Sequence, residues 1–331
     1  MAYEQLGSPE IARSEPRKPL VVAHSAAEWL ELFGNPAKAT AATVGNFDGV
    51  HTGHRKILDD VAQRAHQSQW MPAVLTFDPH PTRILRPEAA PLQIEMLAQR
   101  LEGFSRSGIE AALVLPFTLE LAQVSAHAFV EKFLVETMRA KAVLVGESFR
   151  FGHRQEGDVR LLEKLGDKFG FEVDVIAPVG DGNSMVSSSA IRQAVSEGRM
   201  EVARHMLGRP FALLGEIRPG TEQGRKLVVP TLNLTTQQEL LPKNGVYATE
   251  SVVHGKTYQS VTNIGVRPTF DGRQVSIESH LFDFAEMLSA GGMEVRFKSR
   301  LRDEQKFPNV EALREQVLKD VERAKKFPPT A

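Results

Sequence analysis

The sequence predicts an α/β protein in two parts, a parallel sheet with helices followed by an antiparallel β-barrel with a C-terminal helix. In the first half, short continuous apolar runs alternate with helical patterns, which is typical of a parallel sheet covered on both faces. From Phe211 onward, short strand patterns follow one another closely between Gly, Pro, Asn and Asp, as in a closed barrel. A break at Gly208-Arg209-Pro210 separates the two patterns. The predicted divisions are a loose tail over 1–18, a first domain over 19–205 and a second over 206–331.

The composition is that of an ordinary globular protein. The 331 residues allow two domains of about 150 residues each. A net charge of −1 gives no general attraction to nucleic acid or anionic membranes. The chain has no Cys, which excludes disulfides and thiolate sites and fits a reducing cytoplasm. No apolar run predicts a signal peptide or a membrane span, so we expect a cytoplasmic monomer or weak homo-oligomer acting on small molecules.

The apolar runs of the first half predict six strands, the first of which is either a short strand or only the approach to one. They begin at Leu20, Ala41, Ala73, Ala111, Ala142 and Phe171, and the helical patterns between them lie near 54–67, 94–107, 122–138 and 159–169. Ligands of such sheets bind beyond the carboxyl ends of the strands. We therefore expect the functional residues in the loops that directly follow the runs.

The stretch 43–54 follows the second run and reads Thr-Val-Gly-Asn-Phe-Asp-Gly-Val-His-Thr-Gly-His. It predicts a strand, a tight turn and the first turn of a helix, an arrangement that directs backbone N–H groups at a phosphate. Gly45, Gly49 and Gly53 let the backbone approach such a ligand closely. His51 and His54, three residues apart, can donate hydrogen bonds to charge that develops on phosphate.

Other interpretations of these histidines are a surface or core role, or half of a metal site. A lone His is usually a satisfied structural residue, and glycines before a helix often mark only a turn. No nearby Cys or carboxylate–histidine set completes a tetrahedral zinc site. The residues alone therefore leave a structural role open beside phosphate chemistry.

Three further segments lie where the sheet predicts ligand contacts. The Pro-bracketed loop 77–81 predicts a pocket wall. The loop 146–158, with two Phe and two Arg, suits a flat ring and a phosphate, although a mobile surface loop is an equal alternative on composition. Ser187 and Ser188 open a helix with Arg192 one turn in, which predicts a second anion site or an ordinary N-cap.

Two segments of the second half carry candidate chemistry. Thr231 and Asn233 are two residues apart, so on an extended segment both point the same way and could bind Mg²⁺, although a Gly-rich polar hairpin is the better explanation of that segment taken alone. Glu278 lies on the polar face of the strand pattern 275–284. It is either a surface carboxylate or, if this face lines a pocket, a general base for a hydroxyl that attacks phosphate. A terminal helix is predicted after Asn309.

The motifs together resemble prokaryotic FAD synthetases. The first, Gly-Asn-Phe-Asp-Gly-Val-His-Thr-Gly-His, is similar to the signature of adenylyl- and cytidylyltransferases. Phe-Asp-Pro-His-Pro, Gly-Glu-Ser-Phe-Arg-Phe-Gly and Val-Ser-Ser-Ser-Ala-Ile-Arg follow in the family's order. The resemblance implies a Rossmann-like nucleotidyltransferase domain that adenylylates FMN. The residues it implies for ATP and phosphate binding are Gly45, Phe47, Asp48, Gly53, His54, Ser187, Ser188 and Arg192, with His51 and His54 as the catalytic pair.

The second half resembles the riboflavin kinase module of the same family. The matching pieces include Leu-Gly-Arg-Pro-Phe, Pro-Thr-Leu-Asn-Leu, Asn-Ile-Gly-Val-Arg-Pro-Thr-Phe and Leu-Arg-Asp-Glu-Gln-Lys-Phe, and the resemblance covers nearly all of 40–326. It implies Glu278 as the base, and Thr231 and Asn233 as ligands of Mg²⁺. The flavin and ATP pocket it implies consists of Gly224, Pro230, Thr231, Asn233 and Glu278.

The resemblance predicts a two-step enzyme that makes FMN from riboflavin and then FAD from FMN, with ATP as co-substrate and Mg²⁺ as cofactor. The chain departs from the family pattern at Ser148, where Asp or Asn is usual, and at Ser189, where Thr is usual. In the second half, Val228-Val229 replace Gly-Phe and Leu232 replaces Ala. Two alternatives remain, a riboflavin kinase with a weak or inactive first domain, and a non-enzymatic flavin-binding regulator.

Overall fold

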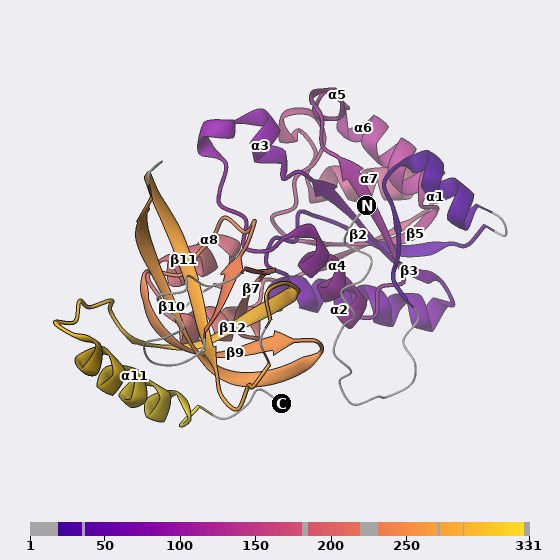
Figure 1. Ribbon diagram of the computed structural model, residues 1–331. Helices are drawn as coiled ribbons and strands as arrows, with labels where there is room; N and C mark the ends of the chain where they lie inside the picture. The colour runs from indigo at the N-terminus through magenta and orange to yellow at the C-terminus, as the bar shows by residue number, and fades with distance from the viewer. Residues whose placement is uncertain are drawn as a thin grey trace. The chain divides into compact units, whose positions relative to one another are not determined.

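The chain forms two compact units, one ending at Ser188 and the other beginning at Ser189 (Figure 1). The computed structural model describes residues 19–34, 37–180, 185–218, 231–269, 272–286 and 288–327. The predicted tail over 1–18 lies outside them. The predicted domain boundary at 205/206 stays a prediction.

The first unit contains a six-stranded sheet in which every neighbouring pair is parallel, in the order β1-β4-β3-β2-β5-β6. All six predicted strands are confirmed. Their bounds are β1 Val21–Ala23, β2 Thr40–Val44, β3 Met71–Asp78, β4 Ala111–Pro116, β5 Ala140–Gly146 and β6 Glu172–Ile176. Every residue of β2 is buried, which explains why this strand appears in the sequence as a continuous run without alternation.

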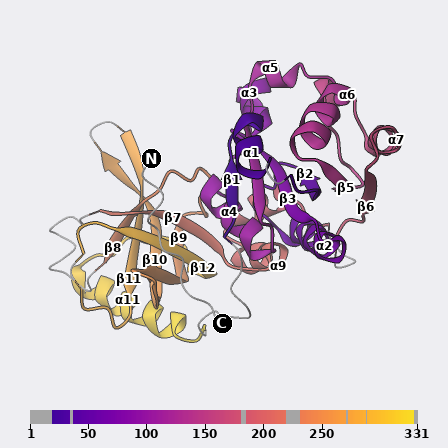
Figure 2. The same cartoon turned by 90° about the vertical axis from the view of Figure 1, so that its right-hand side faces the viewer.

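Helices cover both faces of this sheet (Figure 2). Side chains of α1, α6, the π-helix and α7 form a core on one face, and those of α2 and α4 form a core on the other. The bounds are α1 Ala26–Phe33, α2 Thr52–Ser68, α4 Leu97–Arg106, α6 Ala126–Phe129, the π-helix Val130–Thr137 and α7 Val159–Phe169. Two short helices, α3 Pro81–Leu85 and α5 Leu119–Ala122, lie in the loops after β3 and β4 respectively. Two 3₁₀ turns are also present, Pro87–Ala89 after α3 and His153–Gln155 after β5.

The sheet has a switch point between β2 and β5. The chain builds β3 and β4 on one side of β2, and β5 and β6 on the other. The segments that leave the carboxyl ends of β2 and β5 therefore diverge, and a crevice at such a point is where ligands bind in open α/β sheets.

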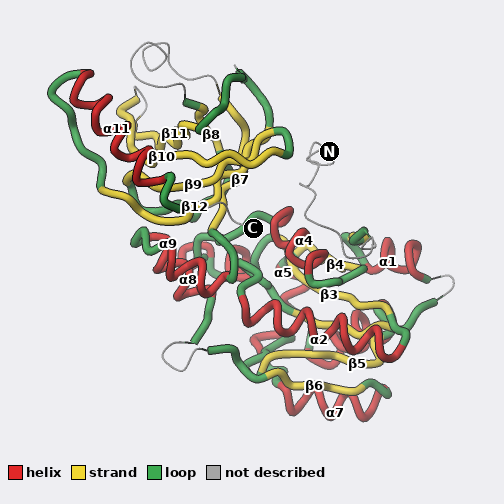
Figure 3. The backbone as a smooth tube through the Cα atoms, turned by 90° about the horizontal axis from the view of Figure 1, so that it is seen from below, coloured by secondary structure: helices red, strands yellow, loops and turns green. Residues whose placement is uncertain are grey.

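The second unit is a closed barrel with the strand order β10-β11-β8-β7-β12-β9 (Figure 3). The predicted barrel and C-terminal helix are confirmed. The strands are β7 Phe211–Arg218, β8 Leu232–Thr235, β9 Gly245–Val253, β10 Lys256–Thr269, β11 Gly272–Leu281 and β12 Gly292–Arg302, and the helices of this unit are α8 Ser188–Ser196, α9 Met200–Leu207 and α11 Val310–Ala324. Asn309 caps α11 by accepting from the N–H of Ala312 at 2.9 Å. The strand predicted over 275–284 ends earlier, at Leu281, because Asp283 has a φ of 56° in the following turn.

The two faces of the barrel strands differ in chemistry. Val246, Ala248 and Val261 pack against α11, which lies outside the barrel (Figure 3). Because side chains alternate along a strand, residues of the other parity face the interior. They include five buried hydroxyls that hydrogen-bond to one another, Thr249, Ser251, Ser260, Thr262 and Ser279. Glu278 precedes Ser279 and so belongs to the outward face.

Candidate active sites

The turn between β2 and α2 has an unusual backbone. Phe47 and Val50 have positive φ values of 51° and 32°, a region that bulky and β-branched residues rarely adopt. The ring of Phe47 packs edge-on against Phe104 of α4, with 5.4 Å between ring centroids. Val50 lies so close to Gly103 that a Cβ there would be 3.0 Å from it. Packing against α4 therefore holds the turn in its strained conformation.

Asp48 stabilises this turn from within. Its buried carboxylate accepts from the backbone N–H groups of Ile94 at 3.0 Å and Glu95 at 3.3 Å. Its carbonyl accepts from the hydroxyl of Ser188 at 2.9 Å. The side chains of Asp48 and Phe47 thus help to build the turn, and their predicted part in phosphate binding stays a prediction.

His51 and His54 lie together at the start of α2. His51 is the N-cap, and its Nδ1 accepts from the backbone N–H of His54 at 3.2 Å. The two rings are stacked, with 3.6 Å between centroids and 16° between planes. A Cβ on Gly53 would lie 3.2 Å from the His51 ring, so the glycine leaves room for this arrangement. The predicted histidine pair is thus one local structure.

The protonation of His54 follows from its surroundings. Burial, and then the neighbouring His51, hold the pKa of His54 well below its usual value, so the ring is neutral near pH 7. Among the described residues, its enclosed Nδ1 has no hydrogen-bond partner. A buried polar atom without a partner is costly, and a bound ligand can satisfy it.

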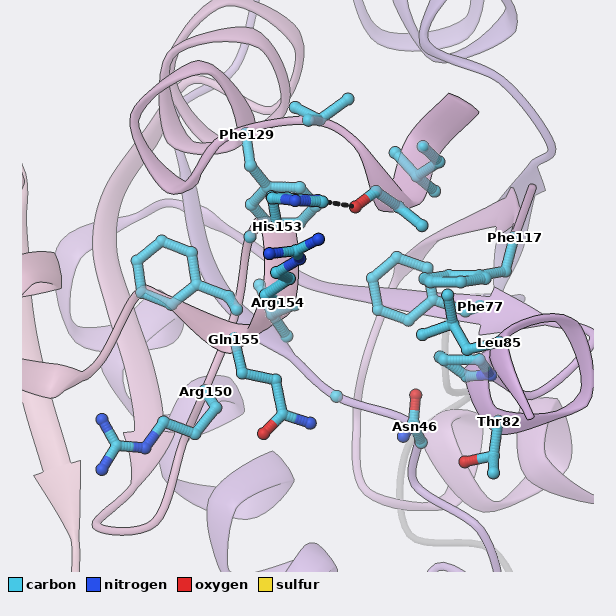
Figure 4. Close-up of a pocket in the computed structure, with 18 of the residues that line it drawn as sticks. Asn46, Phe77, Thr82, Leu85, Phe117, Phe129, Arg150, His153, Arg154 and Gln155 are labelled. Atoms are coloured by element: carbon cyan, nitrogen blue, oxygen red, sulfur yellow. Dashed lines mark hydrogen bonds between the residues drawn. The ribbon is translucent and has the colours of Figure 1, made fainter. Parts of the chain in front are cut away.

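A cavity of about 1060 Å³ opens at the carboxyl ends of β2, β3 and β5 (Figure 4). Gly45 and Asn46 line it after β2, and the loop after β3 contributes residues such as Thr82 and Leu85. Five phenylalanines also line it, namely Phe77, Phe117, Phe129, Phe149 and Phe151. A largely apolar, aromatic cavity of this size suits a flat ring system together with a nucleotide.

The third wall of the cavity is the loop that follows β5. Phe149 and Phe151 are stacked, with 5.3 Å between centroids and 14° between planes. The backbones of Phe151 and Gly157 exchange two hydrogen bonds, of 2.9 and 3.1 Å. Ser148, the first departure from the family pattern, also lines the cavity. The loop therefore closes on itself and presents an aromatic surface to the cavity.

This loop is also fixed to the segment after β4. The ring Nδ1 of His153 lies 2.9 Å from the carbonyl of Ala122, and its backbone N–H donates to Val124 at 2.8 Å (Figure 4). At Gly152, with a φ of 74°, a Cβ would lie 2.5 Å from the backbone N of Ala126, so no other residue fits. These contacts favour a pocket wall over the alternative of a mobile surface loop.

The predicted second anion site lies at the start of α8. The helix begins at Ser188, with Ser187 before it and half-buried Arg192 one turn in. Ser188 donates its hydroxyl proton to the carbonyl of Asp48. Ser189, the other departure in the first half, is exposed on this helix.

In the barrel, strand register brings the predicted residues together. Glu278 of β11 is the direct neighbour of Asn233 on β8 and of Asn263 on β10. Glu278 is half-buried and accepts from the hydroxyl of Ser276 at 2.5 Å. Thr231 is half-buried immediately before β8. Gly224 and Pro230 lie outside the described residues.

The chemistry of this group of residues fits a hard cation. Thr231, Asn233 and Glu278 offer hydroxyl, amide and carboxylate oxygens, which Mg²⁺ prefers. Within the described ranges, no group of three or more His, Cys, Asp or Glu could hold a metal ion. A site with few protein ligands is typical of Mg²⁺ that also binds substrate phosphates.

Sequence reasoning missed two residues near Glu278. Asn263 is one, because only the pairing of β10 with β11 reveals it. Glu304 is the other: its carboxylate lies where a Cβ of Gly265 would be, and Gly265 pairs with Ser276. The sole signal in the sequence is that Glu304 belongs to the Leu-Arg-Asp-Glu segment, which begins in the last barrel strand and continues beyond it.

Comparison with known proteins gives consistent results for both units. Residues 35–190 match the family model of FAD synthetase, and residues 207–328 match that of riboflavin kinase. A bifunctional riboflavin kinase/FMN adenylyltransferase from Escherichia coli (strain K12) is 34% identical over 293 residues, covering 88% of this chain and 94% of the relative. One of the same name from Pseudomonas fluorescens is 35% identical over 289 residues, covering 87% of this chain and 93% of the relative.

A solved structure shares the fold. It is titled as a macrolide-efflux protein from Streptococcus pneumoniae and superposes with a TM-score of 0.84 at 27% identity, over 94% of this chain and 100% of that one. In the part of our chain that the structure describes, no helix is long and apolar enough to span a membrane.

Proposed function

Because the chain belongs to the family of bifunctional riboflavin kinases/FMN adenylyltransferases, we propose that its two candidate sites perform the family's two reactions. The barrel unit transfers the γ-phosphoryl group of ATP to the 5′-hydroxyl of riboflavin, which gives FMN and ADP. The first unit joins FMN to the AMP part of a second ATP, which gives FAD and pyrophosphate.

In the first unit, the phosphate of FMN attacks the α-phosphorus of ATP, and the bond to the β-phosphate breaks. The stacked pair His51 and His54 donates hydrogen bonds to the phosphate oxygens on which charge develops. Neutral His54 carries one ring N–H that serves this purpose. Ser187, directly before α8, binds the pyrophosphate end, and the phenylalanine-lined cavity accepts the isoalloxazine ring.

In the barrel, Glu278 accepts the proton of the ribityl hydroxyl as it attacks the γ-phosphorus. Its hydrogen bond from Ser276 fixes the direction of the carboxylate. Asn233, its neighbour across the strands, and Thr231 would hold Mg²⁺. The ion would offset the negative charge of the ATP phosphates.

We also propose which molecules the enzyme acts on, its oligomeric state and its compartment. It acts on ATP, riboflavin and FMN without a nucleic-acid or membrane partner, as a monomer or weak homo-oligomer in the cytoplasm. The near-zero net charge and the cysteine-free composition support this.

One observation carries the assignment of the first reaction, namely a stacked histidine pair at a strained turn beside an aromatic cavity. The test is to incubate the full chain with riboflavin and MgATP and to separate FMN from FAD by chromatography over time. We expect FMN first and FAD afterwards. A second incubation starts from FMN and MgATP, and a product mixture without FAD would overturn the proposal for the first unit.

A further inference from the structure

Arg100 of α4 is almost completely buried, with 3% of its surface exposed, although it belongs to none of the motifs. Its side chain reaches the carboxyl ends of β2 and β3, the two neighbouring strands from which the cavity is built. We propose that Arg100 is a positioning residue for FAD formation, a buried cation that holds these two strand ends in the geometry that adenylyl transfer needs. This inference rests on the proposed location of that reaction in the first unit.

Four acceptors converge on the guanidinium group. Nη1 donates to the carbonyl of Asn46 at 3.0 Å, to the carbonyl of Phe77 at 3.1 Å and to the hydroxyl of Thr76 at 3.3 Å. Nη2 donates to the carboxylate of Asp78 at 2.9 Å. Asn46 and Phe77 both line the cavity. Arg100 thus cross-links the two strands at the residues that contact the proposed ligand.

The charge of Arg100 is compensated on several sides. Burial lowers the pKa of Arg100, while Asp78, Asp48 and Glu95 act in the opposite direction. An arginine keeps its proton in such a setting, so the group is a permanent cation. Removing it would take this donor from the carbonyls of Asn46 and Phe77 and would break the ion pair with Asp78, which is costly.

The contacts of Arg100 complement those that hold the strained turn. Phe47 and Val50, with positive φ, pack against Phe104 and Gly103 of the same helix. Arg100 binds the carbonyl of Asn46, the residue directly before Phe47. Helix α4 therefore fixes both the start and the middle of the turn that carries His51, and a shift of about 1 Å in such a turn can lower a rate by a factor on the order of 100.

Lysine cannot replace this arginine, because one ammonium nitrogen cannot occupy the positions of Nη1 and Nη2 together. In Arg100→Lys, we expect kcat for FAD formation from FMN to fall about tenfold or more and KM for FMN to rise. The kinase reaction is an internal control, and its kcat and KM for riboflavin should stay within a factor of about two. Arg106→Lys is the matched control, since Arg106 lies on the same helix, is exposed and pairs with Glu102.

Folding is measured separately from activity. Both tryptophans of the chain, Trp29 and Trp70, lie in the first unit, so their fluorescence reports the unfolding of that unit alone. If Arg100→Lys keeps the wild-type kcat and KM for FMN, the proposal is overturned. It is also overturned if FAD formation falls only in proportion to the folded fraction, with KM unchanged, because that is a purely structural role.

A second variant covers the case in which Arg100→Lys does not fold. Thr76→Val removes one acceptor of Nη1, together with the long 3.4 Å hydrogen bond that the Thr76 hydroxyl donates to the carbonyl of Asn46, with little change in shape. We expect kcat for FAD formation to fall about threefold, as loss of one hydrogen bond would give, and an unchanged kcat would contradict the proposal. His51→Ala, measured in parallel, tests the location of the reaction. If FAD formation survives that change, the proposed function fails, whatever Arg100 does.

Discussion

The two candidate sites are built in opposite ways. The site in the first unit comes from neighbouring residues on a turn with positive φ at Phe47 and Val50, and packing and hydrogen bonds from α4 hold it. The site in the barrel comes from residues far apart in sequence, and only strand register makes Asn233 and Glu278 neighbours.

The two sites should therefore differ in which substitutions damage them. A strained turn keeps its geometry only while its surroundings hold it, so substitutions outside the site can damage it. Residues on a regular paired strand need no such external support, because the barrel's hydrogen bonds fix their direction. We therefore expect damage to FAD formation from buried residues of α4, and damage to FMN formation mainly from the outward residues of β8 and β11.

The largest effect should come from Glu278→Gln, which separates the two sites most clearly. The amide keeps the size of the side chain but cannot accept the substrate proton. We expect kcat for FMN formation to fall by a factor on the order of 10² to 10⁴, with FAD formation from supplied FMN unchanged. The measurement is chromatography of both flavins after separate incubations with riboflavin and with FMN.

Glu216→Gln is the control for that variant, because Glu216 is an exposed carboxylate on barrel strand β7. It should leave both rates unchanged. Glu278→Gln with wild-type kcat for FMN formation would show that Glu278 is only a surface carboxylate.

His51→Ala should have the reverse selectivity. Loss of a donor to developing charge lowers a rate by a factor on the order of 10² to 10³, so FAD formation should fall by that amount while FMN formation continues. His51→Asn separates the two roles of the residue, because Asn is a good N-cap and restores the start of α2 without restoring the imidazole. We expect it to recover the stability measured by tryptophan fluorescence but not FAD formation.

His66→Ala is the matched control, since His66 is an exposed histidine in the last turn of the same helix. Equal loss of FMN and FAD formation in His51→Ala would indicate a folding defect rather than a role in phosphate binding.

The buried, neutral His54 predicts a pH dependence of stability in the first unit. Its pKa is lower in the folded chain than in the unfolded one, so below about pH 6.5 the unfolded state binds more protons. The free energy of unfolding of this unit therefore keeps its full value above about pH 6.5. It falls as the pH drops, by at most about 1.4 kcal/mol per pH unit, until the pKa of His54 in the folded chain is reached. Unfolding followed by tryptophan fluorescence from pH 8 to 5 measures this.

His54→Gln does not titrate and should show a flatter stability profile than the wild type over the same range. If the free energy of unfolding of His54→Gln and of the wild type changed equally with pH, that result would contradict the burial of a neutral His54 ring.

The sequence was most informative where a signal is local. Continuous apolar runs predicted all six strands of the parallel sheet, and the spacing of turn residues predicted the barrel. The eight-residue helix α1 was not predicted from the sequence. The four residues of β8 were read only as an extended segment.

The histidine pair was predicted from sequence for the same reason, since His51 and His54 meet within one helical turn. What could not be predicted is the direction of a side chain whose partners are distant in the chain. Asp48 belongs to the motif, but nothing local indicates that its carboxylate accepts from the backbone N–H groups of Ile94 and Glu95. Arg100 lies in a predicted helix without any local signal, and its four acceptors come from two other strand ends.

The smallest effect is expected from a change beside Glu278, and it tests how far the regular strand geometry alone positions this base. Ser276→Ala removes the hydroxyl that donates to Glu278, a bond worth about 1 kcal/mol. We expect kcat for FMN formation to fall three- to tenfold, and Ser276→Thr, which keeps the hydroxyl on a strand-favouring residue, to retain most of it. An effect as large as that of Glu278→Gln would mean that the barrel site, like the turn in the first unit, depends on external support, and the contrast between the two sites would then be lost.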